Sequence, residues 1–433
     1  MRRQALGRRA FGPRDSRTPG AEAAAPRIGG VSLAETAQRA TYREVFGVAE
    51  FRALWLAQLL SVAGDQLAKV ALTILVYDRT HSSLLAAVTF AASFVPTFLG
   101  GVVLSGFADR LPRRAVMIAC DVLRALLVAV MAVPGVPLAA LVALLFVVTM
   151  FGTPFTSARA AIFPDVLAGD RYVIGTAVTL TTFQLAQVVG FAVGGGVVGL
   201  FGARPALILD VLTFAASGLL VSFGVRPRAA GRQNGPKSSP MADLVAGIRL
   251  VFATPALRTP MLYGWLASLY NAPEGIAAPF ARQLHAGPAG VGLLLAAGPT
   301  GYTFGAAAFG RFAAPQLRGR LVAPLATSCC LILILIVIVP PFPVTLLILA
   351  ASGACSCFQV AANSDFVVAA PPQQRSQAFG LATGGMSLGQ GAAMVLAGAA
   401  AQHFVPAAVI AASGVIGVIA AVTITAGSTR PVQ

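Results

Sequence analysis

The chain has 433 residues, of which 57% are hydrophobic and only 11% charged, and its formal net charge is +16. This balance exceeds the hydrophobicity of a water-soluble domain. It excludes an ordinary soluble protein and predicts an all-α polytopic membrane protein, because a helix satisfies its own backbone hydrogen bonds in lipid. The alternating pattern that is typical of a membrane barrel is absent from the sequence.

Residues 1–50 are rich in Arg, Gly and Pro and carry no apolar signal sequence, so we expect a disordered basic cytosolic tail. Apolar stretches follow, each close to the roughly 20 residues that one helical crossing needs. We predict twelve transmembrane helices, at 52–77, 84–108, 115–133, 137–160, 172–199, 204–224, 256–283, 288–312, 321–340, 343–369, 375–400 and 405–426.

The longest polar interruption inside the membrane region is residues 225–255, which we interpret as a cytosolic linker. It separates two predicted six-helix halves, 51–224 and 256–426, and residues 427–433 form a cytosolic tail. The halves match weakly, since "ARAAIFPDVLAGDR" after helix 4 aligns with "ANSDFVVAAPPQQR" after helix 10. Two matching halves are typical of transporters that rock around a central site.

The basic residues are distributed unevenly over the predicted loops. With the amino terminus in the cytosol, 26 of the 31 Lys and Arg residues lie on the cytosolic side. Such a bias predicts a multi-pass plasma-membrane protein with both termini in the cytosol. The positive charge then serves topology and attraction to anionic lipid, and we expect no nucleic-acid partner.

The loop between helices 2 and 3 reads "GFADRLPRR" and contains four charged residues within nine. A carboxylate there can lie at the amino terminus of helix 11, where free N–H groups favour negative charge. Contacts that form in one rocking state and break in the other would make the loop a conformational latch. The alternative is a solvated loop whose arginines only set topology. The candidate latch residues are Gly106, Asp109, Arg110, Arg113, Arg114, Asp121, Arg124 and Arg159.

For two of these candidates, Asp121 and Arg124, the alternative is a structural pair within helix 3, since they lie one turn apart. Asp210 follows an external loop at the start of helix 6, where we expect a helix cap or a gate.

The loop "GFADRLPRR" resembles the loop signature of the major facilitator superfamily, with Pro112 where the family usually has glycine. Over residues 51–425, "FRALWLAQLLSVAGDQLAKVAL", "DVLRALL", "ARAAIFPD" and "LILDVLTFAAS" resemble the branch that contains enterobactin exporters and macrolide efflux proteins. The resemblance implies the major facilitator fold, a latch that holds the outward-facing state, and a central cavity lined by helices 1 and 7.

Ionisable groups within the spans cost about 2.5–3.5 kcal/mol each on insertion scales, so they are candidates for function. Asp65 and Lys69 lie four residues apart in helix 1 and can pair; a permanent pair that only orders the helix is the alternative. Glu274 lies deep in helix 7 between Pro273 and Gly275, which loosen a helix and free its backbone toward a cavity. We predict proton coupling by these ionisable groups.

Polar uncharged residues in the second half are candidates for substrate hydrogen bonds or for contacts between helices. The predicted set for proton coupling and the substrate cavity is Asp65, Lys69, Glu274, Gln359, Asn363 and Gln390. Small residues four apart let helices approach closely, and we expect this packing role for Gly190, Gly194 and Gly195.

The sequence contains no phosphate-binding loop, zinc-protease motif or nucleophile elbow, so we expect neither an enzyme nor a cofactor or metal site. We predict a secondary active transporter, a proton-coupled exporter of amphiphilic organic molecules such as drugs, antibiotics or siderophores. The alternatives are a solute–proton symporter on the same fold and a membrane scaffold or signalling protein. The expected partners are a small-molecule substrate, protons and membrane lipid, and the expected state is a monomer.

Overall fold

The computed structural model describes residues 41–96, 99–100, 111–228, 240–371 and 374–428, and helices make up most of them. The helices of the first half are α1 (Tyr42–Gly47), α2 (Ala49–Thr80), α3 (Ser83–Ala91), α6 (Arg113–Ala132), α7 (Leu138–Val166), α8 (Asp170–Phe201) and α9 (Ala203–Gly224). Those after residue 239 are α10 (Pro240–Ala253), α11 (Pro255–Trp265), α12 (Ala267–Tyr270), α13 (Ala272–Gly275), α14 (Ala277–Gln283), α15 (Gly287–Phe312), α16 (Pro315–Ile334) with η1 (Leu335–Ile338), α17 (Phe342–Cys355), α18 (Phe358–Ala369), α19 (Arg375–Ala400) and α20 (Pro406–Ser428). No strand occurs among these residues, as expected for an all-α protein.

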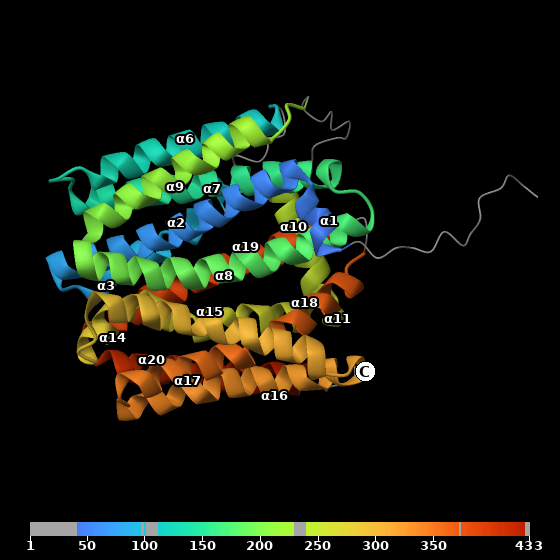
Figure 1. Cartoon of the computed structure of the whole chain (residues 1–433). Coiled ribbons are helices and arrows are strands. Elements are labelled where there is room, and N and C mark those ends of the chain that lie inside the picture. Colours follow the sequence, from blue (N-terminus) through green and yellow to red (C-terminus); the bar gives the residue numbers. More distant parts are fainter. Residues whose placement is uncertain (1–40, 97–98, 101–110, 229–239, 372–373, 429–433) are drawn as a thin grey trace, which may run out of the picture. The chain divides into compact units, whose positions relative to one another are not determined.

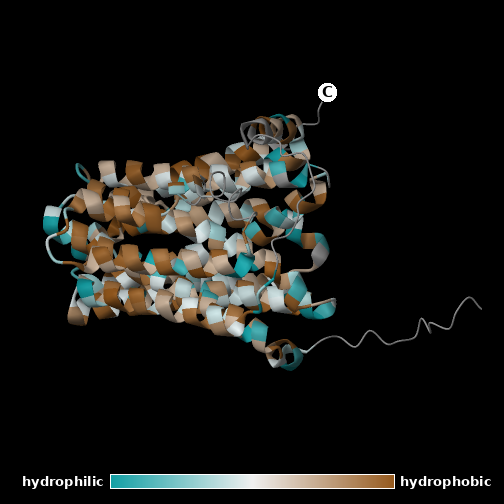
Figure 2. Ribbon diagram, turned by 90° about the horizontal axis from the view of Figure 1, so that it is seen from above, coloured by the Kyte–Doolittle hydropathy of each residue, from teal (hydrophilic) through white to brown (hydrophobic). Residues whose placement is uncertain are grey.

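Eight helices of the described chain are long and apolar enough to cross a membrane. They are Ala49–Thr80, Arg113–Ala132, Leu138–Val166, Asp170–Phe201, Ala203–Gly224, Gln316–Ile338, Phe342–Ala369 and Pro406–Gly427. Hydrophobic residues cover most of the helix lengths and hydrophilic residues gather toward the ends (Figure 2). The chain is therefore a polytopic helical membrane protein.

The other four predicted spans are also at least partly helical. The span 84–108 begins as α3, the span 256–283 is the interrupted series α11–α14, and 288–312 and 375–400 correspond to α15 and α19. The last two are rich in Gly and Ala. Such small residues contribute little hydropathy, but they let helices approach closely.

The described helices belong to one compact unit that starts at Ala40. Helices α2, α6, α8 and α9 lie together on one side of it, and α15, α16, α17 and α20 on the other (Figure 1). Each side has a hydrophobic core of its own, one around Met117 and Phe155 and the other around Phe358 and Cys329. A larger core contains residues of both sides and joins them.

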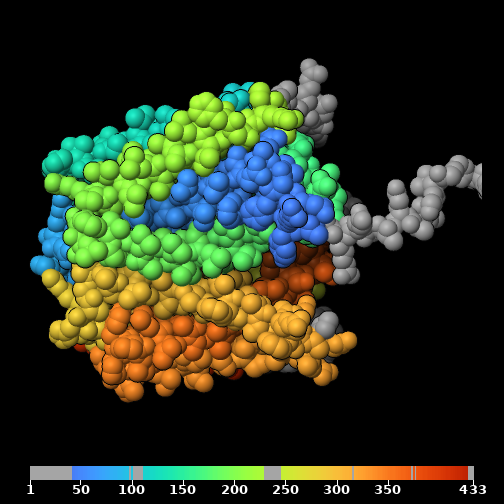
Figure 3. Space-filling model, in the orientation of Figure 1, coloured from blue at the N-terminus to red at the C-terminus, as the bar shows by residue number. Residues whose placement is uncertain are grey.

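Helix α8 packs against α15 and α3 packs against α19, and these contacts join the first half to the second. The first contact is visible along one face of the molecule (Figure 3). It depends on two glycines, since a Cβ on Gly195 would lie 2.7 Å from the Cα of Gly292. Gly190 and Gly194 instead face α2, where their added Cβ atoms would meet Ala63 and Leu67.

The expected disordered tail, 1–50, is wrong for its last ten residues. Residues 42–47 form α1, which buries Val45 completely, and α2 already begins at Ala49. Thr41 accepts a hydrogen bond from the backbone N–H of Glu44 and caps α1. Packing of Val45 and Phe51 against Phe163 orders this segment. Residues 1–40 lie outside the described residues.

The predicted linker 225–255 contains a helix that its polar composition concealed. Helix α10 packs against α19, where a Cβ on Gly247 would lie 2.6 Å from the carbonyl oxygen of Gln377. Val251 is completely buried in a core that also contains Leu257 and Phe366. This apolar contact anchors the end of the linker to the second half.

Candidate functional site

A cavity of about 260 Å³ lies between α8 and the helices of the second half. It is lined by Gln184, Gln187, Ala267, Tyr270, Asn271, Pro273, Glu274, Ala277, Phe280, Leu294, Leu295, Gly298, Pro299, Tyr302, Leu333, Leu349, Ser352, Gly353, Ser356, Gln359, Met386 and Gln390. Glu274 is the one acidic side chain among these residues, and none of them is Lys, Arg or His. The cavity is therefore a largely uncharged, hydrogen-bonding chamber with a single carboxyl group.

Glu274 reaches the cavity because its helix is interrupted. The segment after Trp265 consists of three short helices, separated at Leu266, Asn271 and Ile276. Pro273 lacks an N–H, and Gly275 lets the chain approach α19 so closely that a Cβ there would lie 2.8 Å from Met394. The loosening predicted from Pro273 and Gly275 thus coincides with the place where the carboxyl group enters the cavity.

Helix α11, just before the interruption, is fixed to α19. The indole N–H of Trp265 donates to the carbonyl oxygen of Ala382 at 2.9 Å, and its ring lies against Gly385. The chain's other tryptophan, Trp55 in α2, donates to the Thr182 hydroxyl of α8 at 2.8 Å. Each indole therefore bonds within its own half.

Several polar side chains that line the cavity are held by neighbours in the second half. The amide of Gln359 donates to the Tyr270 hydroxyl and also lies 3.5 Å from the carbonyl oxygen of Gly264. The hydroxyl of Ser352 donates to the carbonyl oxygen of Cys329 at 2.7 Å. These bonds fix the wall of the cavity. Gln359 and Gln390, predicted from sequence, line it, whereas Asn363 is exposed and lies outside the lining.

The predicted pair between Asp65 and Lys69 is wrong, because Asp65 bonds another helix. The guanidinium of Arg124 in α6 donates to Asp65, and no ion pair within 4 Å joins Asp65 to Lys69. The i,i+4 spacing considers one helix alone, whereas packing supplies a guanidinium from a neighbouring helix, and such a charge-assisted hydrogen bond is a strong one. Lys69 instead lies within electrostatic range of both Asp65 and Glu274.

Asp121 and Arg124, predicted as latch residues, lie in the interior of the first half. Asp121 is 0% exposed and accepts a hydrogen bond of 2.6 Å from Ser217 in α9. Both residues lie at least two turns along α6 from Arg113, or more than about 10 Å at 1.5 Å per residue. At that distance, Asp121 and Arg124 lie too far along α6 to belong to the loop before Arg113. They also do not form the structural pair considered from sequence, since their bonds go to α9 and α2.

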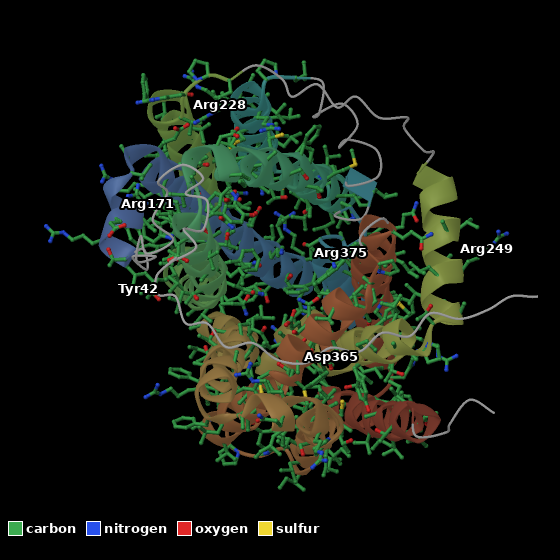
Figure 4. All side chains as sticks on the ribbon, turned by 90° about the vertical axis from the view of Figure 1, so that its right-hand side faces the viewer. Tyr42, Arg171, Arg228, Arg249, Asp365 and Arg375 are labelled. Atoms are coloured by element: carbon green, nitrogen blue, oxygen red, sulfur yellow. The ribbon has the colours of Figure 1, made fainter. Side chains whose placement is uncertain are left out.

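One end of the described unit carries many charged residues, among them Arg171, Arg228, Arg249, Asp365 and Arg375 (Figure 4). We call it the charged end. Here Glu50 accepts hydrogen bonds from the guanidinium of Arg228, which raise the pKa of Arg228. The ion pairs among the described residues here are Arg113–Asp165, Arg171–Glu44, Arg228–Glu50 and Arg228–Asp165, and none of them involves a residue after Arg228.

Of the predicted latch, Gly106, Asp109 and Arg110 lie outside the described residues. Arg113 donates to the carbonyl oxygen of Ala161 at 2.6 Å and pairs with Asp165 at 3.4 Å, both in α7. Arg114 donates to the carbonyl oxygen of Ser222, in the last turn of α9. The guanidinium of Arg159 lies 5.8 Å from the ring centre of Phe163. Arg113 and Arg114 thus fasten the start of α6 to α7 and α9, whereas Arg159 contacts a ring of its own helix.

The two halves are bonded at the end opposite the charged end. Arg282 and the Nδ1 atom of His81 form a hydrogen bond of 2.8 Å, and Gln402 donates to the Ser82 hydroxyl at 3.1 Å. Close contact between Gly195 and Gly292 lies toward the same end, near the last turns of α8 and the first turns of α15. We call this region the joined end.

Sequence reasoning missed the environment of Asp210. The residue is not a cap at the helix start but the eighth residue of α9, and it is 0% exposed. Its Oδ1 atom accepts a hydrogen bond of 3.2 Å from Thr213. Gly64 of α2 lies against it, since a Cβ there would lie 2.2 Å from Asp210, but no signal in the sequence marks this contact. Only a structure connects these two residues.

The fold and the cavity define a multi-pass membrane transporter. Residues 44–431 match the model of the transmembrane secretion effector family, and the chain belongs to this branch of the major facilitator superfamily. The chain is 27% identical to the enterobactin exporter EntS of Escherichia coli (strain HS), over 63% of this chain and 66% of that protein. It is also 27% identical to the enterobactin exporter EntS of Citrobacter koseri, over 61% of this chain and 64% of that protein. The chain thus aligns with slightly less than two thirds of these relatives' lengths.

Solved structures confirm the fold. A bacterial homologue of the human lysosomal transporter Spinster, in an inward-facing and unoccupied conformation, matches with a TM-score of 0.66 and 14% identity, over 90% of this chain and 97% of that chain. The nucleoside transporter NupG matches with a TM-score of 0.63 and 14% identity, over 88% and 100%. The family and these relatives are transporters, not enzymes, which agrees with the sequence prediction.

Proposed function

We propose that the chain is a secondary active exporter that couples proton entry to the export of amphiphilic organic molecules, siderophore-like compounds included. Membership of a secretion family and similarity to two enterobactin exporters support the direction and the substrate class. The observation that carries the proposal is the cavity with its single carboxyl group, Glu274, on an interrupted helix. Interrupted helices at a central site are typical of secondary transporters.

The chemistry of the lining supports a substrate with several hydrogen-bonding groups and an aromatic or apolar surface. Tyr270, Tyr302 and Gln390 offer hydroxyl and amide groups, and Phe280 and Leu295 offer apolar surface. Ligand cavities usually enclose about 300–1,000 Å³. At about 260 Å³ the cavity is slightly smaller. A large substrate therefore enters only when the halves move apart, which is the motion that alternating access requires.

The distribution of basic residues supports a topology with both termini and the charged end in the cytosol. The joined end then faces outward, and the described contacts belong to a state that is closed to the outside. In this state the cavity accepts substrate from the cytosol. We propose that residues 51–224 and 256–426 rock as two six-helix halves of a monomer in the plasma membrane.

Glu274 is placed to link proton binding to this motion. It lies in the second half and attracts Lys69 of the first half, although no ion pair within 4 Å joins them. Protonation of Glu274 removes this attraction between the halves. Proton binding therefore changes the relative stability of the state in which the halves lie together and the state in which they have moved apart. If substrate binding and proton binding at Glu274 exclude each other, the protein carries substrate in one direction and a proton in the other, which is an exchange cycle.

The test is transport by purified protein in vesicles with an imposed pH gradient, in the wild type and in Glu274→Gln. The probes are enterobactin and a lipophilic cationic dye. Glutamine reproduces the protonated carboxyl in shape, so we expect exchange down a gradient to persist and accumulation against a gradient to disappear. The matched control is Glu44→Gln, the same chemical change at an exposed residue of α1.

Accumulation by Glu274→Gln at the wild-type rate would refute the coupling role. Gradient-driven uptake in the reverse orientation would identify a solute–proton symporter instead of an exporter. If neither probe moves in either orientation, the proposed substrate class is wrong.

A further inference from the structure

The first half contains a buried group of ionisable side chains that the proposed role of Glu274 does not use. At its centre is Arg124 of α6, which is 2% exposed. Its guanidinium donates to Asp65 and to the Ser61 hydroxyl at 3.0 Å, both in α2, and lies 4.1 Å from the ring centre of Phe214 in α9. The group therefore lies where α2, α6 and α9 meet.

Two further carboxyl groups belong to this group, and each has one oxygen without a partner. Asp121 and Asp210 are both 0% exposed. Asp121 bonds through Oδ2 to Ser217, and Asp210 through Oδ1 to Thr213. In the described part of the chain, the Oδ1 atom of Asp121 and the Oδ2 atom of Asp210 are buried and accept no hydrogen bond.

The charges of this group do not balance. Arg124 lies within electrostatic range of three carboxyl groups, those of Asp65, Asp121 and Asp210. Lys69, the other base in range of Asp65, also lies in range of Glu274. If all three carboxyl groups were ionised, two negative charges would remain uncompensated in the membrane interior. An unpaired buried charge is unfavourable by several kcal/mol, so the group neutralises itself by binding protons.

Asp210 is the carboxyl group least able to stay ionised. Asp65 bonds Arg124 directly, and its side chain is 28% exposed. Asp121 accepts a hydrogen bond of 2.6 Å from the Ser217 hydroxyl. The hydroxyl that bonds the Asp210 carboxyl group, that of Thr213, lies 3.2 Å away and also donates to the carbonyl oxygen of Asp210 at 2.7 Å. The proton therefore belongs on the free oxygen of Asp210.

The site is built by close packing of two helices. A Cβ on Gly64 would lie 2.2 Å from Oδ1 of Asp210 and 2.1 Å from the Thr213 hydroxyl, so only glycine lets α2 lie against this carboxyl group. Asp65 is the next residue along α2. A change in the charge of Asp210 thus acts directly on the helix that carries Asp65 and Lys69.

We propose that Asp210 is a second proton-binding site, and that its proton decides whether Arg124 bonds Asp65 or Asp210. Asp65 from α2 and Arg124 from α6 lie within electrostatic range of Asp210, and Asp121 from α6 lies within range of the same Arg124. With the proton on Oδ2, Asp210 is neutral and Arg124 bonds Asp65. When the proton leaves to water past the partly exposed Asp65, the new carboxylate competes for the guanidinium.

This exchange would free Asp65 and alter the charge near Lys69 and the cavity. The inference extends the proposed proton-coupled transport and rests on it for its purpose. Proton binding at Asp210 itself is measurable without any transport. A failure of the proposed exporter function and a failure of this site therefore give different results.

The test is infrared spectroscopy of the purified protein in lipid nanodiscs, where a protonated carboxyl group in an apolar site gives a separate C=O band. Both the parent and the variants carry Glu274→Gln, so that Glu274 contributes nothing. We expect a protonated-carboxyl band near neutral pH that Asp210→Asn abolishes and Asp121→Asn retains. A parent without the band, or a band that survives Asp210→Asn, would overturn the proposal. So would a band that disappears only in Asp121→Asn.

Thr213→Val provides a second measurement should Asp210→Asn fold poorly. Valine has the same shape as threonine but donates no hydrogen bond to Oδ1 of Asp210. We expect the band to persist and to move to higher frequency, as for a C=O group that has lost its donor; an unchanged band would assign the proton elsewhere. The band should also be the same in sodium and in choline buffer. A band that appears only without sodium would identify a sodium site and overturn the proposal.

Discussion

The contact between Gly195 and Gly292 allows a sharp test of how the two halves are held together. An added Cβ on Gly195 would lie 2.7 Å from the Cα of Gly292, whereas ordinary contacts begin at 3.4 Å. Gly195→Ala therefore requires α8 and α15 to separate by about 0.7 Å. Overpacking of this kind costs about 1–3 kcal/mol. It acts only on the state in which the joined end is closed, so it shifts the population of the closed and open states about 5- to 150-fold.

Gly196→Ala is the matched control, because nothing lies within 4 Å of an added Cβ at this neighbouring position. Both substitutions replace glycine by alanine near the last turns of α8, and both gain the same helix propensity of about 1 kcal/mol. Only Gly195→Ala meets the other half. The difference between the two variants thus isolates the contact between the halves.

The assay is electron spin resonance distance measurement in a background without the native cysteines. Spin labels replace Arg79 and Phe404, which lie near the joined end in different halves and are exposed. We expect Gly195→Ala to broaden the distance distribution toward longer values, while Gly196→Ala matches the wild type. Identical distributions for the two variants would show that this glycine contact does not hold the joined end closed.

Three further outcomes are expected. Arg124→Met leaves Asp65 without its partner and should lower the free energy of unfolding by about 3–5 kcal/mol, as for other broken buried ion pairs; adding Asp65→Asn should restore part of the loss, and additive effects in denaturant titrations would contradict the pair. Asp109→Asn should slow transport about tenfold or more with substrate binding retained, because a charge-assisted contact contributes about 1.5–3 kcal/mol; this rests on sequence alone, and normal turnover at wild-type expression would reduce the loop to a topology signal. Single cysteines in residues 225–250 should resist an impermeant thiol reagent in intact cells, and labelling from outside would overturn the topology.

Hydropathy and glycine patterns predicted the helical membrane class and the approximate spans, because burial in lipid depends on each segment's own composition. The interruption around Glu274 was predictable for the same reason, since Pro273 and Gly275 act on their own helix. Sequence also selected Glu274, Gln359 and Gln390, which line the cavity. Local chemistry thus provided the candidates.

The contacts that side chains and helices make with distant parts of the chain could not be predicted in the same way. The spacing of Asp65 and Lys69 suggested a pair within one helix, whereas packing brings Arg124 from α6 to Asp65. Asp210 was expected at a helix start, as a cap or a gate, because nothing local shows that Gly64 lies against it. Helix α10 was concealed by polar neighbours in the linker. In each case the deciding contact joins segments that lie far apart in the chain.

The fluorescence of the two tryptophans can report how the halves move. Trp55 bonds Thr182 inside the first half, and Trp265 bonds Ala382 inside the second, just before the interrupted series α12–α14. If the halves turn as rigid bodies, both indoles keep their surroundings and the emission of the unlabelled protein stays constant through the cycle. If α11 bends at the interruption instead, the emission of Trp265 changes while that of Trp55 does not. Native fluorescence therefore distinguishes a rigid rotation from a bending helix without any probe.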